Sequence, residues 1–524
     1  MSSDKATEPS IEKSALSTMV VMVSTMASRL LGFVRIAVIG AVFGGSGQAD
    51  VLNLVFNIPN NLRKLLAEGA LSSAFIPVLS SQIVNDPSGN GARRVVRNLI
   101  AFQFLILIPV LTLSIIFAGP ITGFILDFPE PERRVLAAEL FRYLISYVLL
   151  ISIGAVVMGT LNSHNRFLIP AVTPIFFSIS VVGSILLLHS RLGVFSMAVG
   201  VLLGGLGQLA FQYPSFRRLG YRLRPGFDFR NESFIRILKQ WLPVVSAASI
   251  FAVNQQVSLY FASGLEDGSG SAMTNALVFW QLPFGIFSAS ITTVLFPRMS
   301  RQAAAQDAAG LKRTLEYGVR YLLTLLIPSA ICLALFGREL ISVALQRGAF
   351  EATHTLLASR VLRGYSFGLF SVGLFTFCQR FFYASNDFKT PVRVAFITFV
   401  IDVTLSLILK ETALRVVGLS VANSVAFSFG ALALICVARR RLGGLHLRDI
   451  ARTLAKICLS SVPLVLFIRG YLFYTGNWWI LGSSSLNFLR IAGLGLGSVV
   501  ITLLMYYLLR VELVVNLIRK GKPL

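Results

Sequence analysis

Runs of about 20 apolar residues, the length that a helix needs to cross the hydrocarbon of a bilayer, recur along this chain. We count about fourteen of them, the first centred near residue 28 and the last near residue 499. The pattern predicts an all-α polytopic membrane protein with about 14 transmembrane helices. The first two runs are the least apolar, and their polar residues indicate where a function lies.

The second run carries a polar stripe along one side. On a helical wheel at 100° per residue, the stripe fills a sector of about 100° and rises about 27 Å, close to the thickness of the hydrocarbon. Arg63 sits at its edge, and its members are Asp50, Asn53, Asn57, Asn60, Asn61, Lys64 and Glu68. A helix lying flat on the membrane is an alternative, but it would be expected to carry several Lys or Arg, whereas this stripe is mainly Asn.

The first run contains SRLLGFVR (28–35), which places Arg29 and Arg35 in mid-membrane. Each arginine costs about 2.5–3.5 kcal/mol at a helix centre, so two of them need an explanation. On a straight helix they point about 120° apart. Either Gly32 allows a bend or the two line different walls of one cavity; the alternative is that one or both snorkel to an interface.

Cations and amides along a wet surface suit an anionic, hydroxyl-rich ligand. Arginine matches phosphate oxygens bidentately, and asparagine offers donors and acceptors to sugar or peptide groups. We therefore predict a substrate site in which Glu68 steadies the cations. Its residues are Arg29, Arg35, Asp50, Asn53, Asn57, Arg63, Lys64 and Glu68.

The chain repeats itself at an offset of about 220 residues. NRFLIP (165–170) matches NDFKTP (386–391), IPVLSSQ (76–82) matches FPRMSRQ (296–302), and Ile108-Pro109 matches Ile327-Pro328. Six spans, an even number, separate the copies, which predicts two parallel six-helix lobes and a substrate site between them. A duplication kept only for folding is the alternative.

These features divide the chain into five predicted regions. They are a cytoplasmic N-terminal tail (1–14), an N-lobe of spans 1–6 (15–215), a basic cytoplasmic linker (216–235), a C-lobe of spans 7–12 (236–440), and spans 13–14 with the C-terminal tail (441–524).

Composition and charge agree with a membrane location. Of the 524 residues 55% are hydrophobic and only 13% are charged, too few to cover a soluble globule. The net charge of +24 comes largely from Lys and Arg that follow even-numbered spans, as in the run 439–441. By the positive-inside rule both termini are cytoplasmic, and the basic charge reflects topology rather than nucleic-acid binding.

The sequence shows few signs of metal-binding or nucleotide-binding chemistry. The four cysteines lack CxxC spacing and the four histidines are scattered, so no metal site is predicted. GGSGQAD (44–50) lacks the GK[ST] ending of a P-loop, which argues against direct ATP hydrolysis. We expect no resident cofactor. Coupling to the membrane potential or to a monovalent cation stays open, with no site readable.

Three segments carry a family resemblance. SRLLGFVR, then FG and Asp50, then IPNNLRKLLAEGALSSAFIPVL (58–79), resemble the signature of the MurJ (MviN-type) lipid II flippases, which belong to the multidrug/oligosaccharidyl-lipid/polysaccharide exporter superfamily. LNSHNRFLIPA (161–171) and FYASNDFKTPV (382–392) are similar to two further family motifs. The resemblance spans about residues 15–440. It implies two six-helix lobes around a cationic central cavity, with two C-terminal helices lining a groove for a polyprenyl tail.

The resemblance also implies an activity. A member of this family is not an enzyme but a transporter of the bacterial cytoplasmic (inner) membrane. It moves lipid II, a disaccharide-pentapeptide on undecaprenyl diphosphate, to the outer leaflet for peptidoglycan synthesis, cell-wall organisation and cell shape. The implied partners are lipid II, membrane lipids and cell-wall synthesis proteins, with no nucleic acid. Arg29, Arg35, Asp50 and Arg63 match functional positions, whereas Ile36 and Val278 replace charges common in the family.

Four alternatives remain. A flippase for another polyprenyl-diphosphate-linked oligosaccharide is the closest by chemistry. A multidrug cation antiporter ranks lower, because an arginine-rich cavity repels organic cations. A polyprenyl phosphotransferase would need clustered carboxylates to hold a metal. A scaffold for cell-wall enzymes leaves the buried arginines unexplained.

Overall fold

The computed structural model describes residues 11–66, 70–86, 88–476, 479 and 485–513. Throughout these residues the secondary structure is helical, without strands, which confirms the all-α prediction. The chain forms two compact units. Unit 1 comprises Met1–Phe43 and Val51–Gln256, and unit 2 comprises Gly44–Asp50 and Val257–Leu524.

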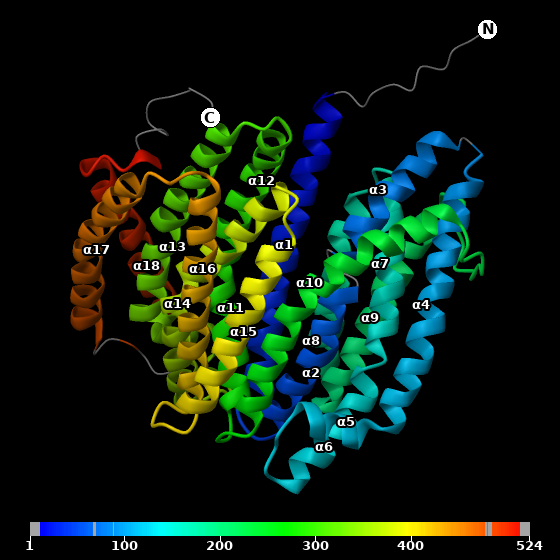
Figure 1. Ribbon diagram of the computed structural model, residues 1–524. Coiled ribbons are helices and arrows are strands. Elements are labelled where there is room, and N and C mark those ends of the chain that lie inside the picture. Colours follow the sequence, from blue (N-terminus) through cyan, green and yellow to red (C-terminus); the bar gives the residue numbers. More distant parts are fainter. Residues whose placement is uncertain (1–10, 67–69, 87, 477–478, 480–484, 514–524) are drawn as a thin grey trace. The chain divides into compact units, whose positions relative to one another are not determined.

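The helices follow one another with short connections (Figure 1). Those up to α10 are α1 (Ile11–Phe43), α2 (Gln48–Leu66), α3 (Ala70–Asn85), α4 (Asn90–Ile116), α5 (Ala118–Ile125), α6 (Pro131–Leu144), α7 (Tyr147–Ser163), α8 (Leu168–Leu192), α9 (Phe195–Arg218) and α10 (Glu232–Ser263). Those after it are α11 (Ser269–Pro283), the π-helical turn η1 (Phe284–Ser288), α12 (Ala289–Ala304), α13 (Ala308–Leu345), α14 (Ala352–Ala384), α15 (Lys389–Leu409), α16 (Val416–Arg441), α17 (Leu447–Thr475) and α18 (Ser485–Leu508).

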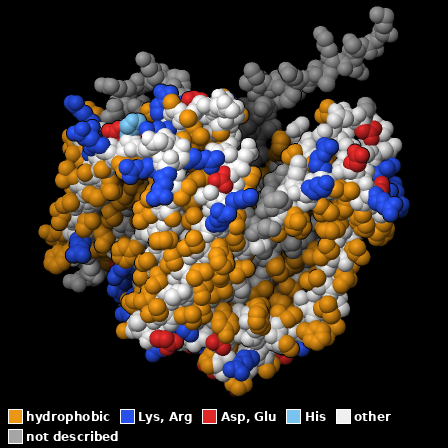
Figure 2. All heavy atoms as spheres, viewed as in Figure 1, with side chains coloured by type: hydrophobic (Ala, Val, Ile, Leu, Met, Phe, Trp, Pro, Cys, Tyr) orange, Lys and Arg blue, Asp and Glu red, His pale blue; other side chains and the backbone are white. Residues whose placement is uncertain are grey.

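Within the described residues, 12 helical segments are long and apolar enough to cross a membrane. The helices α2, α3 and α10 are not among them, and α2 is where the polar stripe lies. The count of 14 therefore stays a prediction. Figure 2 shows hydrophobic side chains over the flanks of the helices and Lys and Arg gathered mainly toward their ends, the distribution expected of membrane helices.

In unit 1, α8 packs against α1 and α9, and α7 packs against α9 and α3. Close approach to α9 depends on Gly204 and Gly205. A Cβ at Gly204 would lie 2.8 Å from the Phe177 ring of α8, and one at Gly205 would lie 2.9 Å from the Tyr147 ring of α7. Because these two glycines have no side chain, both rings can pack directly against the backbone of α9.

The internal repeat is visible in the backbone of both units. Pro77 and Pro109 lie inside α3 and α4, as Pro297 and Pro328 lie inside α12 and α13. The NRFLIP and NDFKTP segments turn the chain between α7 and α8 and between α14 and α15. The predicted lobe boundaries stay predictions, and the two units divide within α10, between Gln256 and Val257.

In unit 2, α14 packs between α13 and α16, and α17 and α18 pack against α13. An apolar cluster joins these last three helices through Phe336, Val343, Leu464, Ile468, Ile491 and Leu494. Polar contacts tie their other ends: Tyr506 Oη donates to the Thr324 carbonyl at 2.7 Å, and Arg320 pairs with Glu512 at 2.7 Å. The C-terminal helices α17 and α18 thus pack on the second unit through α13.

Candidate functional site

The structure describes the side chains of five of the predicted site residues. Arg35 lies on α1, and Asp50, Asn53, Asn57 and Arg63 lie on α2. Arg29 and Lys64 are within α1 and α2, but their side chains lie outside the described residues, as does all of Glu68.

Arg35 is held by aromatic rings inside unit 1. Its guanidinium carbon lies 5.0 Å from the centroid of the Phe177 ring, and that ring lies 5.3 Å from the ring of Tyr147. Arg63 of α2 is close enough to Arg35 for their charges to interact. Two of the predicted cations are therefore brought together by different helices of one unit.

Among the described residues, no carboxylate forms an ion pair with Arg35. A ring face stabilises a cation without neutralising it, since the ring has no net charge. An unneutralised guanidinium in a membrane helix is costly unless a ligand or water meets it. The geometry of Arg35 thus suits an anionic ligand.

The polar stripe of α2 adds amide groups beside this charge. Arg63 Nε donates to Asn60 Oδ1 at 3.1 Å, which orients the guanidinium along the helix. Asn57 Nδ2 donates to the backbone carbonyl of Asn53 at 2.8 Å, one turn earlier. Asn61 is 6% exposed, and neither polar atom of its side chain finds a partner in the described part of the chain.

Asp50 sits in a different environment. It is 1% exposed, and its Oδ1 accepts a hydrogen bond from the backbone N–H of Ser271 at 2.5 Å, in the first turn of α11. It ends a segment, Gly44–Asp50, that belongs to unit 2 although the residues before and after it belong to unit 1. We call this segment the latch. Asp50 is engaged by α11, so its assignment to the substrate stays a prediction.

Further contacts hold the latch on unit 2. The backbone N–H of Gly47 donates to both carboxylate oxygens of Asp267, at 2.7 and 2.9 Å. Gly44 has a φ of 82°, and a Cβ there would lie 2.9 Å from the carbonyl oxygen of Ala349. Glycine is required at this position for both reasons.

A histidine completes the latch. The backbone N–H of Glu351 donates to His354 Nδ1 at 3.0 Å, so in the neutral ring Nε2 carries the proton and donates to Ser46 Oγ at 3.0 Å. The sequence motif GGSGQAD therefore forms a loop that Asp267, Ser271 and His354 of unit 2 hold by hydrogen bonds.

Known proteins resemble this chain over most of its length. The family model "Lipid II flippase MurJ" matches residues 39–489. A protein of Borreliella burgdorferi named "Probable lipid II flippase MurJ" is 32% identical over 511 residues, covering 97% of this chain and 99% of its own length. The chain belongs to the MurJ lipid II flippase family. A Vibrio cholerae relative of the same name is 29% identical over 507 residues, covering 93% of this chain and 95% of its own.

Solved structures show the same fold. A structure of "Lipid II flippase MurJ, inward closed conformation" superposes with a TM-score of 0.75 at 24% identity, covering 96% of this chain and 100% of that one. An inward-facing multidrug resistance MATE family transporter of the MOP superfamily superposes with a TM-score of 0.68 at 14% identity, covering 81% and 98%. This chain therefore shares its fold with both structures, and the family assignment rests on the sequence matches.

Asp402, another intramembrane acid, lies away from the MurJ signature residues in sequence. It is 1% exposed in the middle of α15, accepts from Asn423 Nδ2 at 2.8 Å, and is 3.4 Å from Ser406 Oγ. Its position within α15 excludes helix capping. Its bonds to neighbouring polar side chains support a packing role.

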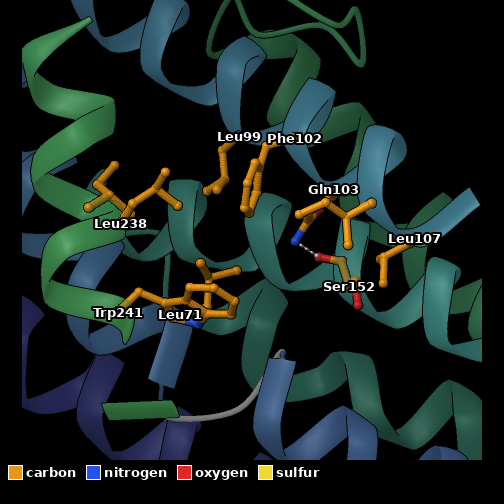
Figure 3. A pocket seen from close by; sticks show the side chains of 10 residues that line it. Leu71, Leu99, Phe102, Gln103, Leu107, Ser152, Leu238 and Trp241 are labelled. Carbon is orange, nitrogen blue, oxygen red and sulfur yellow. Dashed lines mark hydrogen bonds between the residues drawn. The ribbon is translucent and has the colours of Figure 1, made fainter. Parts of the chain in front are cut away.

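A pocket inside unit 1 lies between α3, α4, α7 and α10 (Figure 3). It offers about 50 Å³ of water-accessible space, and its walls are mainly Leu, Ile, Phe and Trp side chains. Gln103 Oε1, Ser152 Oγ and Trp241 Nε1 are buried there without a hydrogen-bond partner among the described residues. This space holds about three water molecules, which can satisfy such atoms, but it is far too small for a disaccharide.

Sequence reasoning missed the aromatic support of Arg35. Nothing in the sequence around Phe177 or Tyr147 marks them, since both lie in apolar runs. The glycine pair Gly204-Gly205 in a predicted span is the one signal that rings from neighbouring helices approach there.

Proposed function

We propose that this chain moves lipid II from the cytoplasmic to the outer leaflet of the bacterial cytoplasmic membrane by alternating access. Arg35 and Arg63 receive the diphosphate, and the amides of Asn53, Asn57 and Asn60 face the sugar and peptide groups. Membership of the MurJ family supports the lipid II assignment.

One observation carries the chemical part of the proposal. Arg35 is stabilised by a ring face rather than by a carboxylate, and Arg63 lies within electrostatic range of it. Two guanidinium groups within electrostatic range disfavour each other's charge, and an anion between them offsets this effect; a diphosphate has oxygen atoms enough to meet both groups bidentately.

Complementation tests this role. In a bacterial strain whose own lipid II flippase can be depleted, the wild-type chain should keep lipid II accessible to a membrane-impermeant hydrolase added outside the cell. Arg35→Ala and Arg63→Ala should abolish that accessibility at normal protein level. Arg35→Lys should retain part of it, because lysine keeps the positive charge but lacks the two-pronged guanidinium that binds a phosphate bidentately. Arg142→Ala, an exposed arginine on α6 without a described side-chain contact, is the matched control. Full activity of Arg35→Ala would refute the assignment.

The related antiporter fold makes a multidrug cation antiporter the second candidate. Organic cations would be repelled by Arg35 and Arg63. Transport of purified polyprenyl-diphosphate-linked sugars, compared with transport of cationic dyes by the same proteoliposomes, separates the two. The same assay with different glycans distinguishes lipid II from another polyprenyl-linked oligosaccharide.

We further propose that both termini are cytoplasmic, because Lys and Arg concentrate after even-numbered spans. A cysteine replacing Arg415 should react with a membrane-impermeant maleimide from outside the cell and one replacing Arg440 should not, in a background lacking the exposed Cys436 and Cys458. Cell-wall synthesis proteins as partners, the absence of a resident cofactor, and coupling to the membrane potential or a monovalent cation belong to the same proposal.

A further inference from the structure

Three arginines of unit 2 stand apart from the cytoplasmic clusters. Arg338 lies on α13, and Arg360 and Arg363 lie on α14; all three side chains are exposed. Among the described residues, none of them lies within salt-bridge distance of a carboxylate. We call these three residues the arginine patch.

The spacing of charges along α13 and α14 gives the depth of the patch. In α13 the uncharged stretch 321–337 separates Arg320 from Arg338, a rise of about 27 Å. In α14 the uncharged stretch 364–379 separates Arg363 from Arg380, a rise of about 26 Å. Both values approach the thickness of the hydrocarbon, about 30 Å, so Arg338 and Arg363 lie at the level of the lipid phosphates.

The patch is at the end of unit 2 opposite to Arg439–Arg441. The turn between α14 and α15, next to Arg441 through its bond to Asp387, lies at the far end of α14 from Arg360. With the orientation proposed above, the patch is at the outer leaflet. Arginines there run against the positive-inside rule, so topology does not explain them.

The arginine patch lies beside a kink in α13. Phe336 has non-helical backbone angles, φ −120° and ψ 18°, and Arg363 Nε donates to the nearby Ala334 carbonyl at 3.1 Å. The carboxylate of Glu339 is within electrostatic range of Arg338 and Arg363, and its Oε2 is buried without a hydrogen-bond partner among the described residues. Even a full negative charge on Glu339 would leave the three arginines with a net positive charge.

The surface next to the patch is apolar. Phe367, one turn from Arg363 towards the centre of α14, is 72% exposed, and Leu356, one turn from Arg360 towards the helix start, is 39% exposed. Residues 356, 360, 363 and 367 follow helical spacing and therefore share one face. An acyl chain can lie along Phe367 while the attached phosphate meets the guanidinium groups.

We propose that the arginine patch binds the headgroup of an anionic glycerophospholipid of the outer leaflet. The net positive charge of the patch favours a headgroup with net negative charge over a zwitterionic one. This site is separate from the proposed lipid II site on α1 and α2, and a lipid bound there anchors the kinked end of α13 in the membrane.

Native mass spectrometry tests the proposal. The full-length protein in detergent is given equal amounts of phosphatidylglycerol and phosphatidylethanolamine, and the retained lipids are counted. The wild-type chain should retain phosphatidylglycerol preferentially, and Arg360→Gln/Arg363→Gln should lower that preference by roughly tenfold or more. Arg415→Gln, an exposed arginine of the loop between α15 and α16 at the same end, is the matched control and should change nothing.

The single variant Arg360→Gln is expected to fold normally, because Arg360 has no described contact with the protein. It should lower the preference for phosphatidylglycerol by about fivefold. The proposal is overturned if the wild-type chain shows no preference for phosphatidylglycerol, or if the double variant retains it unchanged. It is also overturned if an added polyprenyl diphosphate displaces phosphatidylglycerol from the wild-type chain but not from Arg360→Gln/Arg363→Gln, since the patch would then belong to the transport path.

Discussion

The guanidinium carbon of Arg35 lies 5.0 Å from the centroid of the Phe177 ring, so an aromatic face supports the charge that the proposed mechanism needs. A carboxylate at this place would form an ion pair and compete with the diphosphate of a substrate. The ring stabilises the cation and orients it without removing its charge. The ring beside the first-helix arginine is therefore a feature in which this chain and its MurJ relatives can be compared.

Replacing Phe177 by Leu should weaken flipping without unfolding unit 1. Loss of a desolvated cation–π contact costs about 1–2 kcal/mol, which corresponds to a roughly five- to thirtyfold lower rate if the contact positions Arg35 for the substrate. Phe176→Leu is the control, because Phe176 packs on Phe211, 4.4 Å between centroids, and not on Arg35. Externally accessible lipid II is the readout. Equal loss in both variants would contradict a specific role for Phe177.

Gly204→Ala should destabilise unit 1, because the added Cβ would lie 2.8 Å from the Phe177 ring. Overpacking of this kind costs about 1–3 kcal/mol. Gly207→Ala on the same helix meets no atom within 4 Å and should be neutral or slightly stabilising. Thermal unfolding in detergent compares the two. A melting temperature for Gly204→Ala equal to that of Gly207→Ala would mean that α9 and Phe177 are not in tight contact.

The hydrogen bonds of the latch predict that substitutions at Asp50 and Asp267 have coupled effects on stability. Asp50→Ala removes the acceptor for Ser271 N–H, and Asp267→Ala removes both acceptors for Gly47 N–H. Asp50→Ala should destabilise unit 2 by about 1–3 kcal/mol because its bond is buried, and Asp267→Ala should cost only about 0.5–1.5 kcal/mol because its bonds are exposed. The double variant should cost less than the sum, because either change already frees the latch. A double-mutant cycle in thermal unfolding measures this. Strict additivity would show that the two bonds act independently.

A half-buried histidine, His164, predicts that stability falls in acid. Burial, and to a lesser extent the charge of Arg166, lowers the pKa of His164 below its ordinary value of 6.5, and burial raises the pKa of its partner Tyr221 to about 12. His164 Nε2 and Tyr221 Oη are 2.9 Å apart. The unfolded chain binds the proton more readily, so stability from His164 is complete above about pH 6.5 and is lost as the pH falls towards the lowered pKa.

His164→Gln should therefore reduce the fall in melting temperature between about pH 7.5 and about pH 5.5. His189→Gln, on α8, serves as the comparison. If both variants keep the wild-type slope, another group is responsible for it.

The internal repeat predicts matched effects at two asparagines. Asn165 and Asn386 have φ values of 59° and 57°, and the residue after each donates to a carbonyl five residues earlier at 2.9 Å, Arg166 to Leu161 and Asp387 to Phe382. Replacement by Ala should cost about 1 kcal/mol at each site, whereas replacement by Gly should be tolerated. Denaturant unfolding of the four variants tests the match. A loss confined to one site would mean that only one copy of the turn is under strain.

Much of the fold is encoded in local sequence. Apolar runs of helical length require a membrane protein, because a backbone in hydrocarbon must satisfy its hydrogen bonds within the helix. The matching prolines and the turns at Asn165 and Asn386 could be predicted as a repeat, since they are short-range backbone features. The Asn stripe of α2 was also readable, because side chains at helical spacing share a face.

Tertiary structure decided what those residues contact. Asp50 and Arg63 lie on one predicted helix, yet the first bonds α11 of unit 2 and the second approaches Arg35 of unit 1. The Phe177 ring lies over Arg35, and Phe177 and the neighbouring Tyr147 pack where α9 has glycines. Such contacts join different helices, in the case of Asp50 and Ser271 across 221 positions, and the sequence pattern of one helix holds no information about which neighbour it will meet.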